Sequence, residues 1–345
     1  MARRSTITDV AERARTSVAT VSRHLSNNGY PVSEDAKKRI DEAVRRLDYS
    51  PNMVGRMLKK SLGMDIGVII PTIMNPYYPA VVLGIEEEAL RRGYGIFLCN
   101  SQRNPKNEKN YMDSLIQKQV GGIIISSSGK NRAHYEKLNK LGVPVVSLDG
   151  DIPCRGFGKI LFDYEQGAYL AGRHLVELGH TDIAFLTAPL TKKSRIEMQA
   201  GFVRAVGSMA RTVVSEDEKE HVDGTYEFNN GTRLAEMFLK LSPRPSAILA
   251  VNDMTAYGII RRLNENGLRV PEDVSVVGFD DIEFSRMFSP PLTTVSQPSF
   301  RTGKLAARLL FSMLEGNKEE THTLEPILVV RGSTMKKEDQ NGKAN

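Results

Sequence analysis

Seven short apolar runs alternate with amphipathic stretches from Ile66 onward, and this alternation limits the fold of the chain more than any other feature. The runs lie at 66–70, 94–99, 121–126, 143–148, 182–187, 246–251 and 273–279. Runs of β-branched and other apolar residues separated by helices are typical of parallel strands joined by right-handed crossovers. The pattern predicts two α/β halves, at 63–161 and 162–291.

The chain after Pro290 and Pro291 offers a strand-like TTVSQP, a helix over about 300–315 and a last strand at 327–330. We expect these elements to recross the halves, so that about 292–321 joins the first and about 322–334 joins the second. The core is then a two-lobed clamshell of two Rossmann-like parallel-sheet subdomains. The polar tail, 335–345, is predicted to be disordered.

The net charge of +6 is confined to the first 62 residues, which hold 13 Lys and Arg against 7 Asp and Glu. Such a concentrated excess fits a polyanion-binding part, because counterion release from phosphates supplies most of the non-specific affinity for DNA. A solvated charged tail would carry the same charge, so the pattern of apolar residues has to decide.

Residues 1–50 contain three short helical patterns, TITDVAERAR, VATVSRHLS and a segment from Ser33 to about Leu47. Thr8 and Ser17 can cap the first two. The second is expected to face inward through Val18, Val21 and Leu25. Two short helices joined by a three-residue turn and braced by a third make an all-α helix-turn-helix head, although an arbitrary three-helix bundle has similar spacing.

The second helix leaves Ala19, Thr20 and Arg23 facing outward. Small residues beside one arginine allow a helix to enter the major groove of DNA, which favours the helix-turn-helix interpretation. The linker at 51–62 can form a short hinge helix, but Gly55 weakens it. We therefore expect this helix to order only when something packs on it.

The chain resembles the LacI/GalR family of transcriptional repressors over essentially its whole length. TITDVAERA, SVATVSRHLS and YSPNMVGRMLK follow one another at the family's spacing, and the core segments include IGVIIPTIMNPYY, HLVELGHTDIAFL, VPEDVSVVGFDD and PPLTTVSQP. The resemblance implies a helix-turn-helix head, a hinge helix and a core like the periplasmic sugar-binding proteins. It also implies a sequence-specific regulator, binding a palindromic operator as a homodimer, most simply as a repressor.

The resemblance assigns DNA-contacting roles to ten residues. Base-facing positions of the recognition helix match Val18, Ala19, Thr20 and Arg23, and positions that contact the DNA backbone match Thr6, Ser17 and Ser22. Leu58 matches a leucine that kinks the duplex from the minor groove, with Arg56 and Lys59 beside it. Interdomain packing is the alternative role for Leu58.

Ligands of open α/β sheets bind beyond the carboxyl ends of the strands. This rule selects Asn75, Tyr77, Tyr78, Asp149, 187–195, Asn252, Asp253, Asp280 and Asp281. By resemblance, the effector pocket is lined by Tyr77, Tyr78, Asp149, Lys192, Ser194, Tyr226, Asn252 and Asp280. Met198 replaces a frequent pocket arginine of the family, and Arg195 is the candidate substitute. Aromatic faces with amides and carboxylates suit a small polar effector, of the sugar or nucleobase type.

The sequence does not support an enzyme, because it contains no GxGxxG, Walker A, GxSxG or HExxH motif. Its six histidines also lack the spacing of metal ligands. No cofactor or metal is expected. A transport solute-binding protein would share the core fold but would need an export signal and no basic head. We predict a cytoplasmic protein without a membrane segment. The identity of the effector, its sign of action, the operator, the target genes and any protein co-regulator do not follow from the sequence.

Overall fold

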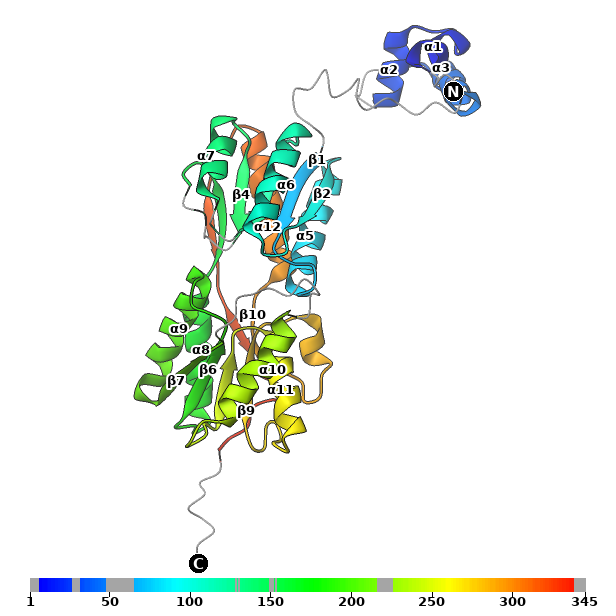
Figure 1. The fold of residues 1–345 in the computed structure, drawn as a ribbon. Helices are drawn as coiled ribbons and strands as arrows, with labels where there is room; N and C mark the ends of the chain where they lie inside the picture. The colour runs from blue at the N-terminus through cyan, green and yellow to red at the C-terminus, as the bar shows by residue number, and fades with distance from the viewer. Residues whose placement is uncertain are drawn as a thin grey trace, which may run out of the picture. The chain divides into compact units, whose positions relative to one another are not determined.

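The computed structural model describes residues 6–26, 32–47, 65–127, 129, 131–148, 152, 154–215 and 226–337. The chain divides into two compact units, Met1–Leu62 and Gly63–Asn345, which are drawn in Figure 1. This division falls where the sequence places the end of the linker.

In its described residues, the first unit forms the helices α1 (Ile7–Arg13), α2 (Val18–Ser26) and α3 (Glu34–Arg46). They enclose a small apolar core made of Val10, Ala11, Ala14, Val21, Ile40 and Ala43. His24 on α2 lies 2.7 Å from the carboxylate of Asp41 on α3 and joins the two helices. The predicted helix-turn-helix arrangement is present.

Two details of the head differ from the sequence analysis. Thr6, and not Thr8, caps α1, because its hydroxyl accepts from the amide of Asp9 while the Asp9 carboxylate accepts from the amide of Thr6. Val18 is 42% exposed, so its predicted inward orientation is wrong. Val18 lies in the first turn of α2, and the part of this helix that packs on α1 and α3 begins after it.

The second unit has two lobes, each built on a six-stranded sheet (Figure 1). The sheet of lobe 1 has the order β11-β5-β4-β3-β1-β2 and is parallel throughout. Its strands are β1 (Asp65–Ile70), β2 (Gly95–Asn100), β3 (Ile123–Ser126), β4 (Val145–Leu148), β5 (Gly158–Phe162) and β11 (Thr321–Leu324). Its helices are α5 (Tyr77–Arg91), α6 (Pro105–Gln117), α7 (Arg132–Lys140) and α12 (Ser299–Leu314).

The sheet of lobe 2 has the order β12-β10-β9-β8-β6-β7, in which β12 alone runs antiparallel to its neighbour. Its strands are β6 (Ile183–Thr187), β7 (Ala210–Val214), β8 (Ala247–Ala250), β9 (Ser275–Asp280), β10 (Thr293–Ser296) and β12 (Ile327–Val329). Its α-helices are α8 (Tyr164–Glu177), α9 (Lys193–Val206), α10 (Tyr226–Leu239) and α11 (Asp253–Glu265), and the two short 3₁₀ turns are η1 (Gly207–Met209) and η2 (Glu283–Arg286).

The chain passes between the lobes later than the sequence analysis places the crossings. β10 pairs with β9 and therefore belongs to lobe 2, whereas the predicted boundary assigned it to the first half. β11 pairs with β5 and belongs to lobe 1, whereas it was assigned to the second half. The crossings consequently lie near Gln297 and between Leu324 and Ile327.

The start of the predicted disordered tail is tied to lobe 2. The amide of Met335 donates to the hydroxyl of Ser275, and the amide of Lys337 donates to the carbonyl of Leu178. His180 lies 3.3 Å from the carbonyl oxygen of Met335. The prediction is wrong for 335–337, and 338–345 lie outside the described residues.

Across the described ranges, no helix combines the length and apolar character that a membrane crossing requires.

Candidate effector site and DNA-binding helices

The outward side of α2 carries the residues predicted to read bases. Val18, Ala19 and Arg23 are exposed, and Thr20 is half-buried beside them. The amide of Thr20 donates to the hydroxyl of Ser17, so Ser17 caps α2 as predicted. The hydroxyl groups of Ser17 and Thr20 also lie within 2.8 Å of each other, which fixes the first turn of the helix.

The other predicted DNA contacts divide into those that the structure describes and those that it does not. Thr6 and Ser22 are exposed, Thr6 at the start of α1 and Ser22 on α2. Arg56, Leu58 and Lys59 lie outside the described residues.

A pocket lies between the two lobes of the second unit, with a volume of about 570 Å³ including its open mouth. It is lined by Asn75, Tyr77, Tyr78, Arg103, Tyr164, Lys192, Ser194, Arg195, Met198, Glu227, Val251, Asn252, Phe279, Asp280 and Gln297. Eight of the eleven residues predicted for the effector site are among them.

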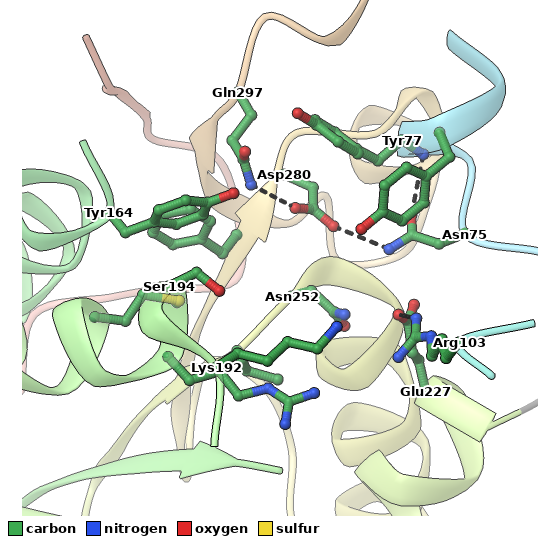
Figure 2. A pocket seen from close by; sticks show the side chains of 15 residues that line it. Asn75, Tyr77, Arg103, Tyr164, Lys192, Ser194, Glu227, Asn252, Asp280 and Gln297 are labelled. Atoms are coloured by element: carbon green, nitrogen blue, oxygen red, sulfur yellow. Dashed lines mark hydrogen bonds and ion pairs between the residues drawn. The ribbon is translucent and has the colours of Figure 1, made fainter. Parts of the chain in front are cut away.

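Asp280 is the centre of a hydrogen-bonded chain on one wall of the pocket (Figure 2). Its two carboxylate oxygens accept hydrogen bonds from the side-chain amide of Asn75 at 3.3 Å and from the side-chain amide of Gln297 at 2.8 Å. Asn75 also accepts from the amide of Tyr77 and so sets the start of α5. The chain therefore joins lobe 1, lobe 2 and one of the crossings through a single carboxylate.

The backbone of Asp280 adopts a φ of +128°, which non-glycine residues rarely occupy. Conformations of this kind persist only where the surroundings hold them, and they gather at ligand sites. Asp281 also has a positive φ, but its carboxylate turns away to Arg331. The two adjacent carboxylates thus have separate partners.

Aromatic rings contribute apolar faces to the pocket from both lobes. Tyr77 and Tyr78 meet edge to face, with ring centres 5.2 Å apart. Tyr164 stacks on Phe279 at 6.0 Å in lobe 2. Figure 2 shows Tyr164 and Tyr77 on opposite sides of Asp280. A ring-shaped ligand could lie between apolar faces while its polar groups reach Asp280.

The start of α9 brings Lys192, Ser194 and Arg195 to the pocket, with Met198 one turn further along the helix. The guanidinium of Arg195 donates to the carbonyl of Pro189, so it also braces the loop that precedes α9. Met198 is buried and contributes an apolar side chain to the lining of the pocket. The position that usually holds an arginine is therefore apolar in this chain.

Two described residues that were predicted for the effector site, Asp253 and Tyr226, are not among the lining residues. Asp253 is fully buried in lobe 2, where it accepts from the hydroxyl groups of Ser285 and Thr294 and from the amide of Ile282. Burial raises the pKa of Asp253 to about 6. Tyr226 is buried beneath the guanidinium of Arg103. Asp149 lies outside the described residues.

Further residues that line the pocket were not predicted from the sequence, among them Arg103, Tyr164, Glu227 and Gln297. Arg103 and Tyr164 follow β2 and β5, so the rule of carboxyl strand ends would have found them if applied to every strand. β5 was not predicted, which hid Tyr164. Glu227 lies at the start of α10, and Gln297 lies in a crossing between the lobes. No sequence pattern predicts a ligand site at either position.

Comparison with known proteins gives the same assignment for both units. Residues 6–52 match the family of bacterial regulatory proteins described as the lacI family, and residues 173–334 match a periplasmic binding protein-like domain. A transcriptional repressor named PurR from Mannheimia succiniciproducens is 36% identical over 335 residues, covering 96% of this chain and 99% of the relative. PurR of Actinobacillus pleuropneumoniae serotype 3 is 37% identical over 333 residues, covering 95% and 98%.

Solved structures show the same likeness. The lac repressor dimer bound to operator and the anti-inducer ONPF superposes with a TM-score of 0.81 at 28% identity, covering 96% of this chain and 100% of that one. A LacI family regulator from Enterococcus faecium with bound ribose gives 0.70 at 28% identity, covering 79% and 100%. The chain therefore belongs to the LacI family of bacterial regulatory proteins and is a DNA-binding transcriptional repressor with an effector-binding core.

Proposed function

We propose that this repressor binds a two-fold symmetric operator as a homodimer and that a small polar effector, held between its lobes, controls the binding. The observation that carries the proposal is the pocket itself, because residues of both lobes and of one crossing converge on Asp280. A ligand at such a place has different contacts when the lobes move, and only a differential affinity can shift an equilibrium between conformations.

Reading of DNA is assigned to the outward side of α2. Val18, Ala19, Thr20 and Arg23 would face base edges, of which Arg23 offers the bidentate donor that guanine accepts. Thr6, Ser17 and Ser22 would contact phosphates. Arg56, Leu58 and Lys59 remain proposals from the sequence alone. One head spans only a half-site, and the related lac repressor is a dimer on its operator, so two copies are expected here.

The effector is proposed to be a sugar or a nucleobase. The apolar faces of Tyr77, Tyr164 and Met198 suit a ring, and Asp280 with Asn252 supplies hydrogen-bonding groups for its edge. Relatives of this fold bind ribose and cellobiose. Asp149 and Tyr226 stay proposals, and Asp253 is better explained as a structural residue. The named relatives are repressors, which supports a chain without enzymatic activity that acts where the chromosome lies, in the cytoplasm.

The proposal is tested by selecting DNA ligands for the full chain from a random pool and measuring affinity by fluorescence anisotropy. Selected sites with two-fold symmetry are expected. D-ribose, cellobiose, adenine and guanine are then added, and at least one should change the affinity of the wild type but not of Asp280→Asn. Sites without symmetry, or an equal response of the variant, would argue against the proposal.

A further inference from the structure

Arg103 is held over the pocket by an unusual loop between β2 and α6. Gln102 and Arg103 have φ of +53° and +55°, a region that non-glycine residues seldom occupy. The amide of Arg103 donates to the carbonyl of Pro71, and Asn104 caps α6. Because both ends of the loop are fixed, the strained backbone directs the side chain toward lobe 2.

Glu227 receives this side chain in the first turn of α10. The guanidinium of Arg103 donates to the Glu227 carboxylate, and its carbon lies 5.6 Å from the ring centre of Tyr226. The side chains of Arg103 and Glu227 are only 13% and 12% exposed. Salt screens such a pair much less than a pair at the surface, and separating the two charges leaves each without its partner.

The ion pair connects the lobes at a second place, away from the wall formed by Asn75 and Asp280. Figure 2 shows the two contacts as separate bridges, with Lys192 and Asn252 near the space between them. Arg103 belongs to lobe 1 and Glu227 to lobe 2, and both line the pocket. Rotation of the lobes away from each other has to break this pair.

We propose that Arg103 and Glu227 form a latch that holds the lobes together over the effector pocket in the ligand-free protein, so that an effector enters by breaking it. The inference rests on the proposed function only in that it takes the pocket to be the effector site. The latch itself concerns the two lobes and can be measured without any ligand.

The test measures the distance between the lobes by pulsed electron paramagnetic resonance in the full chain. Spin labels are placed at Lys109→Cys on α6 and Lys240→Cys after α10, both exposed, with Cys99 and Cys154 changed to serine. The variants are Arg103→Met, Glu227→Gln and the charge exchange Arg103→Glu with Glu227→Arg. Glu236→Gln is the control, because it breaks an Arg–Glu pair of 2.8 Å within lobe 2.

Each single variant is expected to raise the population with the longer distance at least tenfold, while the charge exchange returns the distribution toward that of the wild type. Glu236→Gln should leave it unchanged. The inference is overturned if the single variants keep the wild-type distribution, if the exchange behaves like the single variants, or if the control opens the lobes as much as they do.

A second measurement tests the proposed effector class independently of the latch. Thermal shifts of the unlabelled wild type with D-ribose, cellobiose, adenine and guanine report whether the pocket takes such ligands. Absence of any shift counts against the proposed effector class, while the ligand-free distances still decide the latch. Ligand binding with unchanged distances in the single variants rejects the latch alone.

Discussion

Asp253 shows how a carboxylate beside an effector pocket can serve the fold. Three donors, from Ser285, Thr294 and Ile282, surround it, yet complete burial raises its pKa from 3.8 to about 6. The folded state therefore holds a proton on Asp253 in a range where the unfolded state has released it. The contribution of this group to stability is fully present below pH 3.8 and is lost as the pH rises through about 6.

This linkage predicts a pH-dependent difference between the wild type and Asp253→Asn. At pH 7 the variant should be less stable by roughly 1–3 kcal/mol, since an amide nitrogen replaces an oxygen that accepts from a buried donor. From pH 4 to pH 7 the free energy of unfolding should fall more steeply for the wild type. Urea unfolding at several pH values checks this, and parallel pH profiles would contradict it.

Arg23 is the exposed side chain of α2 with the greatest capacity to distinguish base pairs. Arg23→Ala should reduce the preference for operator over scrambled DNA by roughly 1–3 kcal/mol, because a bidentate contact to guanine is lost while phosphate contacts remain. Lys38→Ala on α3 removes the same charge and should keep the preference. Equal discrimination by Arg23→Ala and wild type in competition binding would exclude Arg23 as a reader.

At the scale of elements, three helix pairs approach so closely that glycine is required where they cross. An added Cβ at Gly231 of α10 would lie 2.1 Å from the carbonyl oxygen of Thr255 in α11. The same holds for Gly201 of α9 against Glu165, and for Gly303 of α12 against Val81 of α5. Because backbone atoms are the obstacle, the helices themselves would have to separate.

Gly231→Ala is therefore expected to destabilise the core by about 1–3 kcal/mol, the usual cost of overpacking. Thr232→Ala, one residue further on the same helix, removes only side-chain atoms and should cost much less. Thermal unfolding of the full chain compares the two variants. A melting temperature of Gly231→Ala equal to that of the wild type would show that α10 and α11 can part without cost.

Six of the seven apolar runs found from the sequence form strands whose side chains are almost all buried, whereas β2 is an edge strand with Leu98 exposed. The seven predicted strands all form, with ends within two residues of the prediction. β7 and β11 were missed because they are edge strands with partly exposed, polar residues such as Arg211 and His322. The site was predicted where side chains follow those buried strands. Glu227 and Gln297 were not predicted as site residues, because only the tertiary fold brings them to the pocket.

At the scale of the whole molecule, apolar residues remain exposed on both lobes. Leu83 and Leu90 lie one above the other on α5, and Leu98 lies on the neighbouring edge strand β2. In lobe 2, Phe284, Met287 and Phe288 are exposed at and after η2, with the ring of Phe288 stacked on Tyr257 of α11. In Figure 1, α5 and β2 lie on the same side of the second unit as α11. A surface of this kind is typical of a protein–protein interface.

We predict that these residues form the interface of a homodimer, because each head reads a half-site and needs a second copy at a fixed distance. Leu90 is 66% exposed and Met287 is 69% exposed, so a charge at either position should cost little in an isolated chain. In a dimer the same charge would be buried without a partner and would drive dissociation. Sedimentation equilibrium should give twice the chain mass of 38.3 kDa for the wild type and a shift toward the monomer for Leu90→Glu and Met287→Glu. Leu141→Glu, on an exposed residue after α7, is the control and should stay dimeric. A wild type of four chains, or dimers of unchanged strength in both variants, would place the interface elsewhere.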